Sequence, residues 1–127
     1  MTQYAAVEAL TGDNKAMKEM VETFGKRREF MLKKLEGMKA LGFDFVKPDG
    51  AFYAMLLCDN LYGRTFRGKR IRGSLDLAEM LLEYKKVAVT ACVVFGDDDF
   101  IRISYALSEG EIEVGLDRIV EFAKETE

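Results

Sequence analysis

The chain has 127 residues, 49% of them hydrophobic and 32% charged, and a formal net charge of −3. This composition indicates a globular protein with a single domain over residues 1–127, and the negative charge argues against nucleic-acid binding, which depends on basic surfaces. No apolar run is long enough to span a membrane and no secretory signal opens the sequence, so we expect a cytoplasmic protein without membrane contact.

Histidine is absent from the sequence. The commonest general base and the commonest transition-metal ligand are therefore missing, and catalysis by this chain would need other side chains or a cofactor. The cysteines, Cys58 and Cys92, both lie in apolar runs. We expect them to be buried, reduced thiols and not a disulfide or a metal site.

Helical periodicity dominates the N-terminal part of the chain. Residues 2–10 predict a short amphipathic helix that ends at Gly12, and Asp13 is a suitable cap for the next helix. That helix is long and carries one apolar stripe at helical spacing, and we expect it to stop at Gly42. The stripe consists of Met17, Met20, Val21, Phe24, Met31, Leu35 and Met38. Because the helix is longer than a small sheet needs, we expect part of this stripe to meet another domain.

Strand signals follow Gly42. Phe43 and Phe45 alternate with polar neighbours, residues 48–50 form a turn, and residues 51–57 predict an apolar strand. Residues 59–73 are basic and punctuated by glycine, but they lack the glycine spacing of a phosphate-binding P-loop. We expect this segment to be a solvated surface connection.

The second half of the chain predicts a third helix, two strands and a last helix. Ser74 is the expected cap of the third helix, and residues 87–89 predict a short strand. The buried face of that helix is expected to comprise Leu75, Ala78, Leu81 and Leu82. Ser108 and Glu111 have the spacing of a capping box before the last helix. This order predicts an α+β fold: a small, mostly antiparallel or mixed sheet covered mainly on one face by helices.

Arg102 lies in the middle of the predicted strand 100–106. Side chains alternate across a strand, so Ile101 and Ile103 share one face and Arg102 projects from the other. A guanidinium fixed on a rigid strand needs an anion, and its planar set of donors suits a carboxylate or a phosphate. From the residues alone, the favoured partner is one of the aspartates at 97–99, which otherwise form a solvated turn.

Several short motifs occur in the order found in one enzyme family. They are Gln3-Tyr4-Ala5-Ala6, Phe24-Gly25-Lys26-Arg27-Arg28-Glu29, Pro48-Asp49-Gly50-Ala51-Phe52-Tyr53, Leu81-Leu82 with Val87-Ala88-Val89 and Phe95-Gly96, and Arg102-Ile103-Ser104-Tyr105-Ala106. With these motifs the chain resembles the C-terminal, small domain of the class I/II pyridoxal-phosphate-dependent aminotransferases, aspartate aminotransferase type. The resemblance covers essentially the whole chain but only the final part of such an enzyme.

The resemblance implies a role for Arg102, because the arginine of the last motif binds the α-carboxylate of the amino acid or 2-oxo acid substrate in this family. Arg27 and Arg28 are expected to act in helix packing and ion pairing. Pyridoxal 5′-phosphate, the cofactor of the full-length enzyme, and the lysine that binds it would belong to a large domain absent from this chain. We therefore expect the chain to bind no cofactor and no metal and to be inactive alone, as part of an enzyme that is a homodimer at full length.

One motif departs from the family pattern, and one feature favours a different function. Thr90-Ala91-Cys92 stands where the family has a turn containing Pro-Gly, so we expect the backbone beside the site to take its own path. The long apolar helix also favours an alternative function, a stand-alone interaction or self-associating module that reuses this fold.

Overall fold

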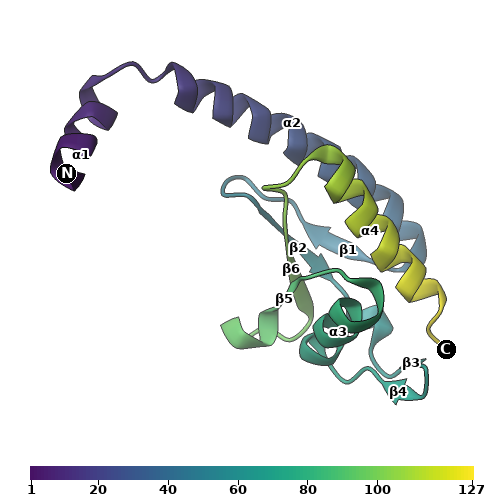
Figure 1. The fold of residues 1–127 in the computed structure, drawn as a ribbon. Coiled ribbons are helices and arrows are strands. Elements are labelled where there is room, and N and C mark those ends of the chain that lie inside the picture. The colour runs from purple at the N-terminus through teal and green to yellow at the C-terminus, as the bar shows by residue number, and fades with distance from the viewer.

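The predicted α+β class is confirmed by the structure, a computed structural model that describes all 127 residues. Helices pack against one face of a small antiparallel sheet (Figure 1). The helices are α1 (Thr2–Thr11), α2 (Lys15–Met38), α3 (Ser74–Met80) and α4 (Glu109–Lys124). The strands are β1 (Asp44–Val46), β2 (Tyr53–Leu57), β3 (Thr65–Phe66), β4 (Lys69–Arg70), β5 (Thr90–Ala91) and β6 (Phe100–Ser104). Short 3-10 turns span Lys39–Leu41, Asp59–Leu61 and Cys92–Phe95, and a π-helical turn extends α3 over Leu81–Lys85.

The main sheet has the strand order β1-β2-β6-β5, and every neighbouring pair is antiparallel. Strand β6 is therefore central, with β2 on one side and β5 on the other. The register places Leu56 opposite Ile101, and both side chains are fully buried on the face that the helices cover. Because side chains alternate across a strand, the neighbouring Met55 and Arg102 project from the opposite face.

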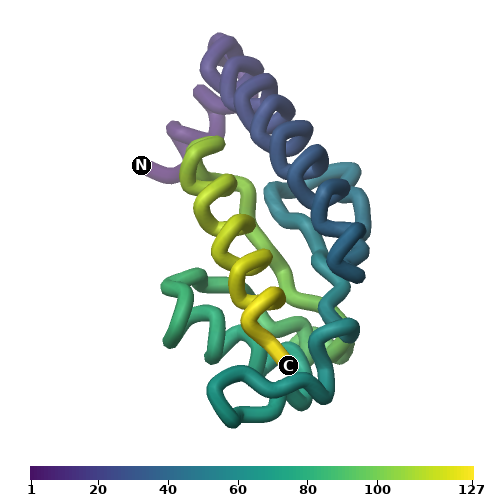
Figure 2. The backbone as a smooth tube through the Cα atoms, turned by 90° about the vertical axis from the view of Figure 1, so that its right-hand side faces the viewer, coloured from purple at the N-terminus to yellow at the C-terminus, as the bar shows by residue number.

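The covering helices are the second half of α2 and α4, which lie side by side in both views (Figures 1 and 2). Their buried side chains belong to a single hydrophobic core with the sheet and α3. The predicted capping box at the start of α4 is present: Ser108 Oγ accepts a hydrogen bond from Glu111 N at 3.3 Å, and the Glu111 carboxylate accepts one from Ser108 N at 3.0 Å. This hydrogen-bonded start fixes the point at which the chain leaves β6 and turns back over the core.

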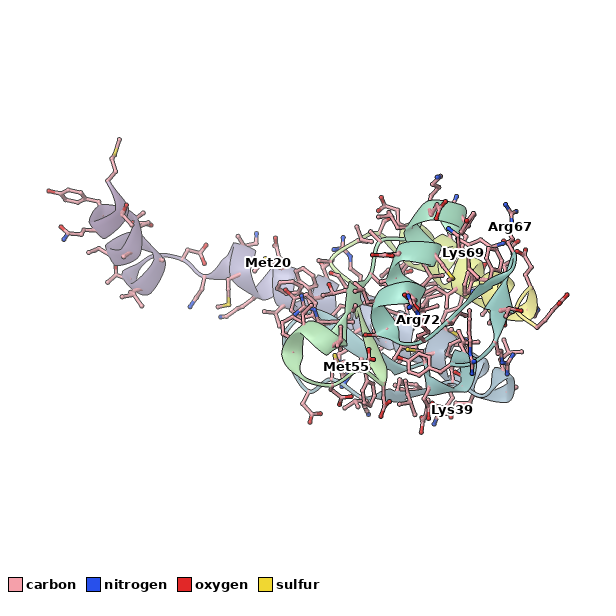
Figure 3. All side chains as sticks on the ribbon, turned by 90° about the horizontal axis from the view of Figure 1, so that it is seen from below. Met20, Lys39, Met55, Arg67, Lys69 and Arg72 are labelled. Carbon is pink, nitrogen blue, oxygen red and sulfur yellow. The ribbon has the colours of Figure 1, made fainter.

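The N-terminal part of the chain extends away from this body as a helical arm, residues 2–23 (Figure 3). No residue of α1 is buried. The prediction that Asp13 caps α2 is wrong: the N-cap is Asn14, which makes no side-chain cap hydrogen bond, and Asp13, one residue earlier, accepts a hydrogen bond from Lys15 N at 2.8 Å. The exposed fractions of Leu10 and Met20 are 87% and 53%. The stripe on α2 is thus buried only at its C-terminal end. None of the helices combines the length and apolarity that crossing a bilayer demands.

The segment 59–73 is more ordered than predicted. It contains the hairpin β3–β4, and its apolar side chains Leu61, Phe66 and Ile71 are core residues with exposures of 0–2%. The basic side chains point outward, as Arg67 and Lys69 illustrate (Figure 3). The prediction of an entirely solvated connection was wrong. Basic residues dominate the sequence of this segment, and the three buried apolar residues are too widely spaced to form a recognisable pattern.

Two further predictions need correction. Ser74 does not cap α3 but is its first residue and is fully buried, because its hydroxyl donates to the Asp98 carboxylate. The buried side chains of α3 and its extension are Leu77, Met80 and Leu81, whereas Leu75 and Leu82 are more than half exposed. The strand predicted at 87–89 forms at residues 90–91 instead, since these pair with β6.

Candidate functional site

The exposed face of the sheet is centred on Arg102. Strand pairing places its Cα opposite Met55 of β2 on one side and Thr90 of β5 on the other. A position in the central strand, paired on both sides, gives the residue a rigid backbone. The side chain is half-buried, so the sheet holds its aliphatic part while its end remains accessible.

Two aromatic rings contact the Arg102 guanidinium. Its Cζ lies 4.3 Å from the ring centroid of Tyr53 and 4.9 Å from that of Phe95. Tyr53 comes from β2, and Phe95 comes from the 3-10 turn that follows β5, so the rings approach from the two strands that flank β6. The turn ends at Gly96 with φ of +92°, a conformation that favours glycine. Both contacts are within the range of cation–π attraction.

No carboxylate of the chain pairs with Arg102. The sequence-based expectation of an ion pair with residues 97–99 is wrong: Asp97 Oδ1 accepts from Asp99 N at 3.1 Å, and Asp98 Oδ1 accepts from Ser74 N and Ser74 Oγ at 2.9 and 2.7 Å. Arg102 also donates no hydrogen bond to any other group. The only buried side-chain oxygen or nitrogen without a partner is Asn60 Oδ1, so the unpaired nitrogens of Arg102 reach solvent.

Asp98 instead anchors the turn that leads into β6. Its carboxylate approaches Gly73 so closely that a Cβ there would lie 2.4 Å from Asp98 Oδ2, which explains the glycine although its backbone is extended. The Tyr62 hydroxyl donates to the Asp98 carbonyl. Cys58 Sγ donates to the Asp99 carbonyl at 3.3 Å, and burial raises the pKa of this thiol to about 12. These contacts fix the start of the strand that carries Arg102.

The aromatic contacts continue from the site to α2. The ring centroids of Phe52 and Tyr53 are 4.4 Å apart, and those of Phe24 and Phe52 are 6.1 Å apart. Arg28 Nε donates to the Pro48 carbonyl at 2.7 Å and its guanidinium pairs with Glu29 at 2.6 Å, which agrees with the expected packing and ion-pairing role. The helix and the turn before β2 are thereby joined beside the Arg102 face.

The segment Thr90-Ala91-Cys92 forms the edge of the same face. Thr90 and Ala91 pair with Arg102 and Ile101 of β6, and Cys92 opens the 3-10 turn that carries Phe95. Cys92 and Cys58 are free and buried, as expected. Burial raises the pKa of the Cys92 thiol, and the nearby positive charge of Arg102 partly offsets this rise.

A separate apolar groove of about 770 Å³ lies between α4 and residues 86–89. Ile103 lines it from the core side of β6, and Arg102 does not contribute to it. The candidate site is the open face around Arg102, which is separate from this groove.

Sequence reasoning found Arg102 but not the residues that contact its guanidinium. Tyr53 and Phe95 are far apart in the sequence, and only strand pairing brings them together. One signal was present, since Phe52 and Tyr53 follow a turn at the start of a strand. Chemically, the face presents a fixed, unpaired guanidinium between apolar side chains, which suits one planar anion such as a carboxylate.

Comparisons with known proteins identify the family of this chain. The sequence profile of the family described as aminotransferase class I and II matches residues 1–119. A probable aspartate/prephenate aminotransferase from Rickettsia typhi is 42% identical over 120 residues, which cover 94% of this chain and 30% of that protein. The chain thus spans only about 30% of the length of this relative.

Solved structures give the same result. The fold matches the crystal structure of the aspartate aminotransferase from Rhizobium meliloti with a TM-score of 0.88 and 37% identity, over 98% of this chain and 31% of that one. It matches the aspartate aminotransferase from Thermotoga maritima with a TM-score of 0.75 and 36% identity, over 96% and 28% of the two chains. The chain therefore belongs to the class I and II aminotransferases.

Proposed function

We propose that this chain is the small domain of a pyridoxal-phosphate-dependent aminotransferase and that Arg102 binds the α-carboxylate of its substrate. The observation that carries the proposal is the state of Arg102: it is central in the sheet, contacted by two rings, and pairs with no carboxylate of the chain. A half-buried guanidinium that the protein leaves unpaired is suited to an external anion.

The geometry favours a carboxylate over a simple inorganic ion. A guanidinium can donate two parallel hydrogen bonds to a carboxylate, and this pairing fixes orientation as well as position. An α-amino acid held in this way has its reacting carbon at a defined distance from the bound carboxylate. Such positioning lowers the entropic part of the reaction barrier.

The residues around Arg102 do not fit the cofactor itself. Tyr53, Met55, Thr90 and Phe95, which contact Arg102 or lie opposite it, include no amine that could bind an aldehyde and no carboxylate that could pair with a pyridine nitrogen. Pyridoxal phosphate supplies the carbanion-stabilising chemistry of transamination, and it would be held by residues outside this chain. The chain alone would neither bind the cofactor specifically nor transaminate.

In the longer protein this domain would close over the substrate. Arg102 would gain its anion only when substrate is present, and closure would exclude water from the ion pair and strengthen it. The names of the relatives indicate aspartate or prephenate as substrates of those proteins. For this protein the proposal extends to amino acids and 2-oxo acids as a class, and to a full-length homodimer.

A second candidate function is a self-associating module, and the exposed arm favours it. Tyr4, Leu10 and Val21 are 82%, 87% and 60% exposed, and no element of the chain covers them. In an aminotransferase the missing part of the protein would cover this surface. In a self-associating module a second copy would do so, and the aminotransferase assay below distinguishes the two.

The test uses a chimeric enzyme in which this chain replaces the C-terminal part of the Rhizobium meliloti aspartate aminotransferase. Replacing Arg102 with Ala should lower kcat/KM for aspartate about 100-fold or more, because a buried charge pair loses one partner. The matched control is Arg118→Ala, which removes an exposed arginine of α4 and should leave kcat/KM unchanged. Equal kcat/KM for the two variants would contradict the proposal.

The isolated chain provides a second test. Mixing it with pyridoxal phosphate near neutral pH should give no specific, stoichiometric internal-aldimine absorbance, because the residues around Arg102 include no amine that could bind the aldehyde. A stoichiometric spectral change would show that the cofactor site lies within this chain and would contradict its assignment as a small domain only.

A further inference from the structure

Two arginines of this protein, Arg67 and Arg102, each contact two aromatic rings, but their surroundings differ. The Cζ atom of Arg67 lies 5.5 and 5.1 Å from the rings of Phe66 and Tyr84, and Arg67 is exposed on the β3–β4 hairpin. Arg102 is half-buried in the central strand, and its rings are closer, at 4.3 and 4.9 Å. Only the second arrangement combines close ring contacts with a rigid backbone.

The rings at Arg102 come from separate elements with independent supports. Tyr53 begins β2, where its own backbone pairs with Ser104 of β6, and the ring of Phe52 contacts its ring in a tilted arrangement with the centroids 4.4 Å apart. Phe95 ends the 3-10 turn after β5, and that turn is held by the hydrogen bond from Val93 N to Ser74 Oγ at 3.3 Å. Each ring is therefore placed by contacts that do not involve Arg102.

An arginine side chain has several freely rotating bonds, and binding an anion in one orientation costs the freedom of all of them. Rings that contact the guanidinium remove part of that freedom before the anion arrives. The ring centroids of Tyr53 and Phe95 lie 4.3 and 4.9 Å from the guanidinium carbon, whereas the N–H groups of Arg102 make no hydrogen bond within the chain. Ring atoms at this distance take the place of part of the water around the guanidinium, so its charge is screened less than on an open surface.

We propose that Tyr53 and Phe95 are positioning residues, which hold the Arg102 guanidinium so that its N–H edge meets the substrate carboxylate. This inference rests on the proposed function of Arg102 and names the residues that make its pairing specific. The ring of Tyr53, and not its hydroxyl, carries the effect. Neither residue needs to touch the reacting atoms.

The test measures steady-state kinetics of the chimeric enzyme with aspartate. Tyr53→Leu and Phe95→Leu should each raise KM about tenfold and leave kcat within about twofold, because each removes one ring contact to a group that binds substrate. Tyr53→Phe keeps the ring and should restore the parental KM. Tyr84→Leu removes a ring from Arg67 in the same way and serves as the matched control with an unchanged KM.

A double-mutant cycle separates positioning from a general structural effect. In the Arg102→Ala background, Tyr53→Leu and Phe95→Leu should change KM no further, because the group that they orient is gone. An equal rise in KM with and without Arg102 would overturn the inference while leaving the role of Arg102 intact. A loss in Tyr53→Phe as large as in Tyr53→Leu would also overturn it, because the hydroxyl would then be the active group.

NMR of the Arg102 side chain tests the inference without measuring catalysis. In the parental chain, the NMR signals of the Arg102 side chain should show ring-current shifts and restricted motion on the nanosecond scale, and Phe95→Leu should reduce both. Phe95 is 61% exposed, so this variant should fold like the parent. A mobile, unshifted Arg102 side chain in the parent would refute the positioning role. If Arg102→Ala retains full activity, the proposed function fails, whereas the NMR result still decides whether the rings order this side chain.

Discussion

The two halves of α2 carry the same apolar stripe but have different surroundings. In the second half, Met31 and Leu35 have exposures of 1% and 0% because α4 and the sheet cover them. In the first half, Met17 and Met20 are 47% and 53% exposed, and the chain offers nothing to cover them (Figure 3). Helical periodicity thus identifies which face of a helix is apolar but not what that face contacts.

The body and the arm differ in the same way. The body contains one core of 21 buried residues, whereas no residue of α1 in the arm is buried. An arm with exposed apolar residues is expected where another part of a longer protein, or a second copy, supplies the missing contacts. The following predictions test how far the arm and the body differ.

The largest difference should appear in core truncations. Leu35→Ala should lower the free energy of unfolding of the isolated chain by about 3 kcal/mol, because it leaves a cavity in the core. Met20→Ala, on the same stripe of the same helix, should change it by no more than about 0.5 kcal/mol. Urea unfolding followed by circular dichroism measures both values.

Similar losses in the two variants would mean that the arm is covered in the isolated chain, for example by a second copy. The chimeric enzyme sharpens the comparison further. There Met20→Ala should destabilise more than in the isolated chain, because the added part of the protein covers the arm.

The second prediction concerns association. The isolated chain should self-associate through the arm, and replacing Leu10 and Met20 with Lys should weaken association at least about tenfold, because burying charged groups opposes docking. Sedimentation velocity over a range of concentrations measures the effect. Leu82→Lys, at a residue of the body that is 55% exposed, is the control.

A monomeric parent chain at all concentrations would show that the arm does not mediate self-association and would remove the support for the second candidate function. A larger effect of Leu82→Lys than of the arm variant would place the interface on the body instead.

The sequence was sufficient for those parts of the fold that depend on local chemistry. The alternation around Arg102 and the spacing of Ser108 and Glu111 are short-range patterns, and the structure confirms both. The prediction of a solvated connection at residues 59–73 was wrong because three apolar core residues are dispersed among basic ones. The prediction that Ser74 caps α3 was wrong because the group that accepts the hydrogen bond from Ser74 N is the Asp98 carboxylate, which is distant in the sequence.

The site shows the same limit. Arg102 was identifiable because an arginine in an apolar strand conflicts with its surroundings unless an anion binds there. Its favoured partner was wrong, since adjacency in sequence suggested residues 97–99 whereas the turn directs Asp98 toward α3. Tyr53 and Phe95 could not be assigned because their proximity depends on the strand order β2-β6-β5.

The smallest difference in the free energy of unfolding should be between variants just before the first residues of α4 and of α2. Ser108→Ala removes a capping box at the start of α4, where α4 packs on the core, and should lower the free energy of unfolding by about 1 kcal/mol. Asp13→Ala removes a single side-chain hydrogen bond, to Lys15 N, next to the start of α2, and this end lies in the arm. Its loss should increase local fraying, because the arm opens without unfolding the body.

Hydrogen exchange distinguishes these two effects within one experiment. Ser108→Ala should speed exchange of the core amides of β2 and β6, which open only on global unfolding. Asp13→Ala should speed exchange only in the first turns of α2 and leave the β6 amides unchanged. If Asp13→Ala also accelerated exchange at Ile101 or Ile103, the arm and the body would unfold together, and the difference between the two halves of α2 would be one of exposure alone.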